Sequence, residues 1–148
     1  MATATSKAPH EAQIRGIVEA WAKAVRAQDI NAMLSNYAPD IVSFDAVTKL
    51  QITGLDAVSR RTEEWVTAFQ APIGFEMRDL SITAGDEVAF SHSLNRVNGA
   101  MTNGEKVDMW WRATVCFRKI GGQWLVTHEH ASVPFDMESG KALLDVKP

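Results

Sequence analysis

Hydrophobic residues recur at steps of three and four along the first part of the chain, which is the spacing of an amphipathic helix. This pattern predicts a first helix over residues 9–28. Its apolar face carries Ile14, Val18, Trp21 and Val25. A helix with one such face is expected to pack against a core.

Two shorter helices are predicted further along the chain. Asp29 is placed to cap a helix over residues 30–37, because an aspartate side chain can accept a hydrogen bond from the first turn. The sequence Ala-Pro-Asp at residues 38–40 should end that helix, and a short strand over residues 41–44 should follow. A third helix is predicted over residues 54–69.

The hydrophobic period changes to two in the second half of the chain, which is typical of strands. Strands are predicted over residues 75–84 and 87–98, and two more lie within residues 107–136, joined at Gly121 and Gly122. Helices followed by long antiparallel strands indicate an α+β fold. We expect the curved sheet to wrap around the three helices as a cone with an internal pocket, and its uncovered face to pair with a second copy.

The last two strands have faces of different chemistry, because side chains alternate along a strand. The final strand places His128, His130 and Ser132 on one face. The strand before it carries a matching set: Asp108, Trp110, Arg112, Thr114 and Cys116. We expect these two sets to face the pocket. A register shifted by one residue would turn Thr127, Glu129 and Ala131 inward instead.

Composition narrows the classes of partner. The 148 residues fit one domain over residues 10–148, preceded by a flexible tail over residues 1–9. A net charge of −3 without a Lys/Arg cluster argues against nucleic acid. No apolar run reaches membrane-spanning length, which argues against a membrane partner. The single cysteine, Cys116, fits a reducing compartment, so we expect a cytoplasmic protein.

Three segments carry a family resemblance: NYAPDIVSFD, ITGLDAV and RATVCFRKIGGQWLVTHEHASVPFD. With their order and spacing, they resemble the nuclear transport factor 2-like superfamily, and within it the SnoaL-like and ketosteroid-isomerase-like small bacterial proteins. The resemblance implies a cystatin-like α+β barrel with a pocket at its open end, usually as a homodimer. It says little about the reaction, since the superfamily contains several enzyme classes and non-enzymes.

Against the ketosteroid isomerases, the resemblance extends to single residues. Asp45 matches their carboxylate base, and Gly54 matches the glycine that opens the next helix. Their oxyanion-binding tyrosine falls on Trp21, and the acid that assists it falls on or near Thr114. The base is therefore kept while both donors are lost. We do not expect a true steroid isomerase.

The candidate site combines this base with polar groups on the last strands. We expect Asp45, His128 and Arg112 to be catalytic, as base, acid or base, and cationic donor respectively. The expected substrate-binding residues are Trp21, Phe44, Trp110, His130, Thr114 and Tyr37. No cofactor and no metal are predicted.

Each assignment has a simpler alternative. Asp45 could be a solvated loop residue, and Arg112 could form an ion pair with Asp45, Asp108 or Glu129. The two histidines could hold a metal if His92 or Asp45 supplied a third ligand, but no local motif supports this. For Cys116 we expect a structural role.

Two functions fit these residues. The first is a cofactor-independent enzyme that moves a proton on a small apolar carbonyl substrate, as isomerases, cyclases and dehydratases do. The second is a non-catalytic ligand-binding or association module of the same fold. Convergence of Asp45, Arg112 and a histidine on a dry cavity would favour the enzyme.

Overall fold

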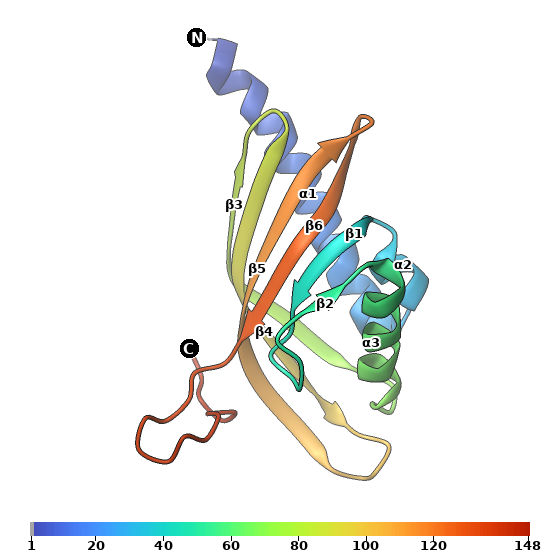
Figure 1. Ribbon diagram of the computed structural model, residues 1–148, viewed down its shortest axis with the longest axis vertical. Coiled ribbons are helices and arrows are strands. Elements are labelled where there is room, and N and C mark those ends of the chain that lie inside the picture. The colour runs from blue at the N-terminus through green and yellow to red at the C-terminus, as the bar shows by residue number, and fades with distance from the viewer. Residues whose placement is uncertain (1) are drawn as a thin grey trace.

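The computed structural model describes residues 2–148, with side chains from residue 8 onward. Its helices are α1 (Ala2–Ala27), α2 (Ile30–Leu34) and α3 (Leu55–Thr67). Its strands are β1 (Tyr37–Phe44), β2 (Ile52–Thr53), β3 (Gly74–Ala84), β4 (Val88–Ala100), β5 (Lys106–Ile120) and β6 (Gln123–Ser132). The strands form one strongly curved sheet, and the helices lie along its concave side (Figure 1). This arrangement confirms the predicted α+β cone.

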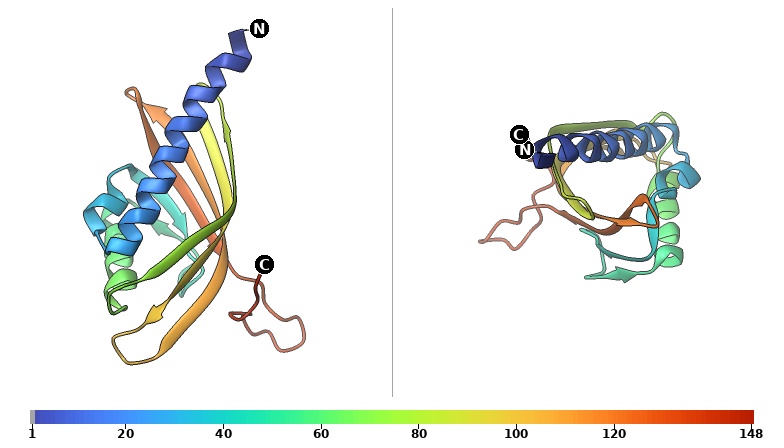
Figure 2. Two further views of the ribbon diagram at one scale, coloured as in Figure 1. Left: turned by 180° about the vertical axis from the view of Figure 1, so that it is seen from behind. Right: turned by 90° about the horizontal axis from the view of Figure 1, so that it is seen from above.

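The long helix α1 spans the open side of the curved sheet, so that sheet and helices together surround an interior (Figure 2). Its residues Ile14 and Val25 are fully buried, as the apolar pattern predicts. The helix begins at Ala2, so the backbone of the segment that we expected to be a tail is helical from that residue onward. No described helix, including the 26 residues of α1, is long and apolar enough to cross a membrane.

The segment after α2 is a strand where the sequence predicted helix and turn. Asp29 caps α2 as expected, by accepting a hydrogen bond of 3.1 Å from the Ala32 backbone N–H. The helix nevertheless ends at Leu34, and β1 already begins at Tyr37. Backbone pairing with β6 explains this, because the Val126 N–H donates to the Asn36 carbonyl at 2.7 Å.

The strand order in the sheet is β2-β1-β6-β5-β4-β3. The pair β1–β6 is parallel, and all other neighbouring pairs are antiparallel. The hairpin between β5 and β6 turns at Gly121 and Gly122, as predicted, with φ angles of 58° and 80° that favour glycine. A bulge in β3 at Asp79, where φ is 57°, interrupts the β3–β4 register and adds to the bend of the sheet.

A second bulge, in β6, decides which side chains enter the interior. Cys116 of β5 pairs with His128, but the next residue, Phe117, pairs with Val126, so Thr127 is an extra residue. Val126 before the bulge is buried in the interior. Past the bulge the alternation restarts, and Glu129 points inward instead of His128.

Two groups of buried side chains support the fold at different ends of the interior. One joins α1 to the sheet near the β5–β6 hairpin: Ile14, Val18, Ile41, Val58, Phe117, Trp124 and Val126. The other joins α1, α2 and α3 to the opposite part of the sheet: Val25, Met33, Val66, Phe69, Ile73, Phe75 and Val97. The space between these groups is where a cavity can remain open.

A residue on the inner face of the sheet and an exposed residue of the C-terminal segment predict different costs of mutation. Phe117→Ala should lower the free energy of unfolding by about 3–5 kcal/mol, because the ring is 2% exposed and its removal leaves a hole in the core. The matched control is Phe135→Ala, because that ring is 60% exposed and its loss should change stability by about 0.5 kcal/mol or less. Urea denaturation of both variants measures this, and equal losses would contradict the assignment of the inner face.

Candidate functional site

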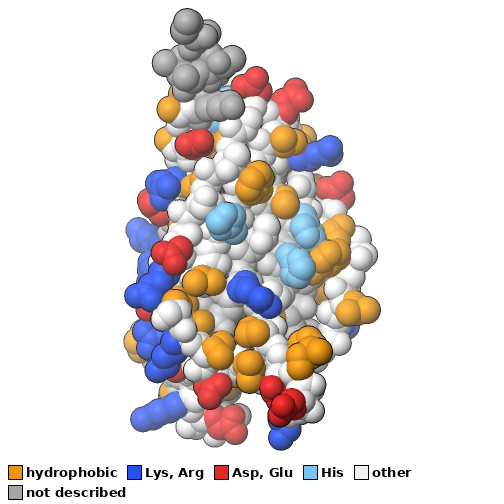
Figure 3. All heavy atoms as spheres, turned by 90° about the vertical axis from the view of Figure 1, so that its left-hand side faces the viewer, with side chains coloured by type: hydrophobic (Ala, Val, Ile, Leu, Met, Phe, Trp, Pro, Cys, Tyr) orange, Lys and Arg blue, Asp and Glu red, His pale blue; other side chains and the backbone are white. Residues whose placement is uncertain are grey.

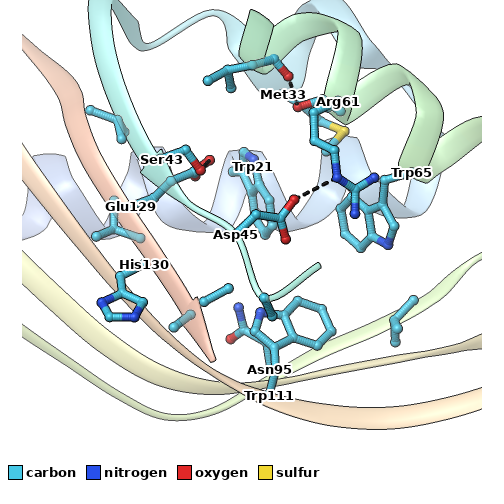
Figure 4. A pocket seen from close by; sticks show the side chains of 18 of the residues that line it. Trp21, Met33, Ser43, Asp45, Arg61, Trp65, Asn95, Trp111, Glu129 and His130 are labelled. Atoms are coloured by element: carbon cyan, nitrogen blue, oxygen red, sulfur yellow. Dashed lines mark hydrogen bonds and ion pairs between the residues drawn. The ribbon is translucent and has the colours of Figure 1, made fainter. Parts of the chain in front are cut away.

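A cavity of about 500 Å³ lies between the helices and the inner face of the sheet (Figure 4). This volume is in the range of small-molecule sites. Both groups of core side chains contribute to its lining, for example Val58 and Phe117 from one and Met33 and Val97 from the other. Most of the lining is apolar, and only a few polar side chains reach the cavity. These polar side chains are the candidates for a chemical role.

Tryptophan rings from three elements line one part of this cavity. Trp21 of α1 and Trp65 of α3 lie nearly parallel, with ring centroids 6.5 Å apart. Trp111 of β5 meets Trp65 edge-on at 6.0 Å, and Phe75 of β3 packs edge-on against Trp21 at 5.3 Å. We call Trp21, Trp65 and Trp111 the tryptophan wall. Such rings offer flat apolar surface to a planar ligand.

A largely buried carboxyl group, that of Glu129, lies at another part of the cavity. The Tyr37 hydroxyl donates to one of its oxygens at 2.9 Å, and the Ser43 hydroxyl donates to the other at 3.1 Å. Burial raises the pKa of Glu129 above its ordinary value of 4.5, although the two hydrogen bonds act in the opposite direction. A carboxyl with a raised pKa is a stronger base than one in water.

The groups around Glu129 form a small polar network. Burial raises the pKa of the Tyr37 phenol well above its ordinary value, and the negative charge of Glu129 acts in the same direction. Tyr37 is therefore a hydrogen-bond donor rather than a phenolate. The indole Nε1 of Trp21 slightly opposes this rise, but it is buried and has no hydrogen-bond partner of ordinary geometry. Its N–H is thus a buried donor without a well-formed hydrogen bond to any described residue.

Asp45 lies in the cavity lining as predicted, but it is held in an ion pair. The Nε atom of Arg61, on α3, donates to Asp45 Oδ2 at 2.6 Å, and the Val47 backbone N–H donates to Oδ1 at 3.2 Å. Both side chains are largely removed from solvent, with 18% of Asp45 and 26% of Arg61 exposed. The partner that we considered for Asp45 was Arg112, so the ion pair exists with a different arginine.

Three predicted site residues lie outside the cavity. Arg112 is exposed on the outer face and donates from Nε to the Ser132 hydroxyl at 3.1 Å. Trp110 lies on the same face, where the guanidinium groups of Arg78 and Arg96 approach its ring to 5.7 and 6.0 Å. The placement of both residues in the pocket was wrong. The alternate residues of β5, from Val107 to Phe117, form a continuous apolar row that faces the interior instead.

His128 is the third residue outside the cavity. Its Nδ1 atom lies 2.7 Å from the Val42 carbonyl oxygen, and its ring meets Phe44 edge-on at 4.6 Å. The bulge at Thr127 is the reason, since it turns Glu129 inward and His128 outward. The sequence analysis was right that these side chains of β5 and β6 share one face of the sheet, because His128 pairs with Cys116 and His130 with Thr114. This shared face is the outer one, and the sequence analysis had expected the inner one.

The remaining predicted residues do contribute to the cavity lining. They are Trp21, Tyr37, Phe44, Asp45, Thr114 and His130. Thr114 and His130 are largely exposed and belong to its rim. Figure 3 shows one face of the molecule, where histidine side chains lie among hydrophobic ones. Among the described residues, no three His, Cys, Asp or Glu side chains are close enough together to hold a metal ion.

Sequence reasoning missed several cavity residues. Arg61 and Trp65 are on the third predicted helix, but nothing in the sequence pattern linked Arg61 to Asp45. Glu129 entered only in alternatives, as an inward residue of the shifted register and as a possible ion-pair partner of Arg112. Ser43 and Asn95 carry no recognisable motif, although both are buried, at 6% and 3% exposed.

Comparisons with known proteins agree with this architecture. The family model described as "SnoaL-like domain" matches residues 14–136. A crystal structure of an NTF2-like protein of unknown function from Pseudomonas putida KT2440 is 42% identical, with a TM-score of 0.87 over 95% of this chain and 98% of that one. No match was found among curated proteins.

More distant structures share the fold alone. A putative dehydratase of the NTF2-like family from Streptomyces avermitilis is 16% identical, with a TM-score of 0.70 over 81% of this chain and 93% of that one. A putative calcium/calmodulin-dependent protein kinase II association domain from Xanthomonas campestris is 19% identical, with a TM-score of 0.70 over 90% and 87%. One of these two proteins is named as an enzyme and the other as an association domain, so the shared fold alone does not indicate a function.

The raised pKa of Glu129 predicts how stability depends on pH. The folded protein keeps the carboxyl proton to a higher pH than the unfolded chain, so the free energy of unfolding should fall as pH rises from 4.5 through the raised pKa. The side chain in Glu129→Gln cannot ionise, so the free energy of unfolding of this variant should lack this fall with pH. Its stability relative to the wild type should therefore improve as pH rises.

Urea denaturation of both proteins over a pH series measures this difference. Glu138→Gln is the matched control, because it removes a carboxylate that is exposed in the C-terminal segment. Parallel pH profiles for wild type and Glu129→Gln would contradict the burial of the Glu129 carboxyl.

Proposed function

The chain belongs to the SnoaL-like domain family of NTF2-like proteins, and from this premise we propose that its cavity catalyses proton transfer on a small apolar carbonyl compound. The carrying observation is the Glu129 carboxyl, which lies in an apolar cavity with its pKa raised by burial. A base of this kind needs no cofactor. An active site that combines a perturbed carboxyl with an apolar pocket is a typical arrangement for proton abstraction next to a carbonyl.

In the proposed reaction, ionised Glu129 takes a proton from the carbon next to the substrate carbonyl. The electron pair of the broken C–H bond moves toward the carbonyl oxygen, which becomes an enolate. The indole N–H of Trp21 is available to donate to this oxygen. Return of the proton from Glu129 to another carbon of a conjugated enolate gives isomerisation. If Glu129 instead gives this proton to a hydroxyl on the β-carbon, the carbonyl re-forms, the C–O bond breaks, and water leaves with formation of a carbon–carbon double bond.

Tyr37 and Ser43 are proposed to hold the base in position. Each donates to a different oxygen of Glu129, so the carboxyl cannot rotate freely. These bonds also limit the rise in the pKa, which leaves Glu129 able to ionise. Both residues come from β1, the strand that runs parallel to β6 and brings its side chains beside Glu129.

Asp45 receives a different proposed role. Asp45 is held in an ion pair with Arg61, whereas Glu129 has no basic partner among the described residues. We propose that it orients Arg61, whose side chain lines the cavity next to the tryptophan wall. Arg112 and His128 take no part in this proposal.

A simple ketone tests the proposed reaction. 2-Tetralone carries exchangeable protons next to its carbonyl, and their replacement by deuterium in heavy water can be followed by NMR. The protein should accelerate this exchange above buffer, and Glu129→Gln should reduce the acceleration by at least about 100-fold, the usual contribution of a general base. Tyr37→Phe should reduce it less.

The control for this experiment is Glu138→Gln, which should exchange as fast as the wild type. Asp45→Asn tests the alternative base. If Asp45→Asn lost all acceleration while Glu129→Gln kept it, Asp45 would be the base. If the wild type gave no acceleration above buffer, the proposed proton transfer would be wrong.

Self-association is a second proposed property, compatible with either a catalytic or a non-catalytic role. The outer face of β4 exposes Val88 by 58% and Phe90 by 45%, and exposed apolar side chains that lie together often mark an interface. The similar Xanthomonas campestris protein is named as an association domain, which is compatible with a fold that assembles. We propose a homodimer through this outer face.

Light scattering tests the homodimer. The wild type should show twice the mass of one chain, and Phe90→Glu should show the mass of one chain, because a carboxylate would be buried without a partner. Met137→Glu is the control, since Met137 is 84% exposed in the C-terminal segment. A wild-type protein with the mass of a single chain at micromolar concentration would refute the proposal.

A further inference from the structure

We infer that the Asn95 side chain is a second polar anchor for the ligand, and that the ligand is an uncharged, elongated planar molecule with an oxygen function at each end. One oxygen would lie near Glu129 and Tyr37, and the other would accept hydrogen bonds from the Asn95 amide. This inference rests on the proposed function, because it takes the same cavity as the ligand site. It can be tested by binding alone.

The first observation is an amide group in the cavity whose nitrogen has no hydrogen-bond partner among the described residues. Asn95 lies in the middle of β4, is 3% exposed and lines the cavity. Its Oδ1 atom accepts a hydrogen bond of 2.7 Å from the Ser93 hydroxyl. Its Nδ2 atom makes no hydrogen bond to any side chain or backbone group that the structure describes. Ser93 therefore fixes the amide so that two N–H donors remain for a ligand.

Figure 4 shows how this amide is directed. Asn95 and Trp111 rise side by side from the floor that the sheet forms, and Glu129 and Ser43 lie on another wall of the cavity. The Asn95 amide is therefore separated from the Glu129 carboxyl by open cavity. A ligand that reached both groups would have to cross this space.

Strand pairing gives the scale of that separation. Ser91, Val115 and Glu129 form one row across β4, β5 and β6. Asn95 is four residues beyond Ser91 on β4, so its Cα and that of Glu129 would be about 16 Å apart in a flat sheet. The curvature of the sheet and the length of the two side chains shorten the gap between the polar atoms. The gap suits a molecule of two or more fused rings.

The surroundings of the amide indicate the chemical class. The tryptophan wall borders the space between the two polar ends, and its flat rings favour a planar ligand. An anion would meet two carboxyl groups, Asp45 and Glu129, and only Asp45 has a basic partner. A neutral oxygen acceptor is the group that an amide N–H₂ in an apolar cavity binds best.

Two naphthols of nearly the same shape test the inference. 6-Acetyl-2-naphthol has a hydroxyl at one end and a carbonyl acceptor at the other, whereas 6-ethyl-2-naphthol lacks the acceptor. Titration calorimetry gives the Kd of each for the wild type, Asn95→Leu and Asn95→Asp. Asn98→Leu is the matched control, because Asn98 is exposed on the same strand. The melting temperature of each variant shows that it is folded.

The wild type should bind the acetyl compound about tenfold more tightly than the ethyl compound, as expected for one buried hydrogen bond. Asn95→Leu should remove this preference, and Asn95→Asp should remove it even if the leucine variant does not fold. Asn98→Leu should keep it. An unchanged preference in both Asn95 variants, or none in the wild type, would overturn the inference.

The experiments distinguish a failure of the second anchor from a failure of the proposed reaction. If Asn95 proves irrelevant to naphthol binding while Glu129→Gln still loses the exchange of 2-tetralone, only the second anchor is wrong. If the preference depends on Asn95 but the wild type does not accelerate exchange, the cavity is a binding site without the proposed chemistry.

Discussion

The buried carboxyl group of Glu129 reaches the cavity because of a single bulge in β6. Thr127 is one residue more than β5 can match, and the alternation of side chains restarts after it. The strand can therefore bury Trp124 and Val126 at one end and still direct Glu129 inward at the other. If the same residues of β6 paired with β5 without a bulge after Val126, His128 would lie opposite Val115 and point into the cavity, and Glu129 would point outward.

The inward position of Glu129 in turn requires the parallel strand β1. A buried carboxyl is tolerated only where hydrogen-bond donors reach it, and Tyr37 and Ser43 supply them from the adjacent strand. Tyr37 pairs with Val126 of β6, and residues 42–44 pair with residues 128–130. The sequence Ala-Pro-Asp at residues 38–40 lies in the register shift between these pairs, where Pro39 needs no backbone N–H for the sheet.

The order and type of the main elements could be predicted from the sequence, because hydrophobic period and the Gly121–Gly122 turn are local signals. The grouping of side chains by strand face was also predictable. Which face lies inside was not, since Trp110 and Trp111 place an aromatic ring on each side of β5. The same limit applies to Asp45 and Arg61, because their ion pair joins residues 16 positions apart through the packing of α3 beside β1.

Several costly polar groups open onto the same cavity. Among the described residues, neither Trp21 Nε1 nor the Asn95 amide nitrogen has a hydrogen-bond partner of ordinary geometry, and burial removes the Glu129 carboxyl from water. Leaving a buried donor unpaired typically costs about 1–3 kcal/mol. Apolar residues in these places would make a more stable protein, while core side chains at both ends of the cavity already hold the fold together. Their concentration around one space is explained if a ligand with matching oxygen atoms occupies it.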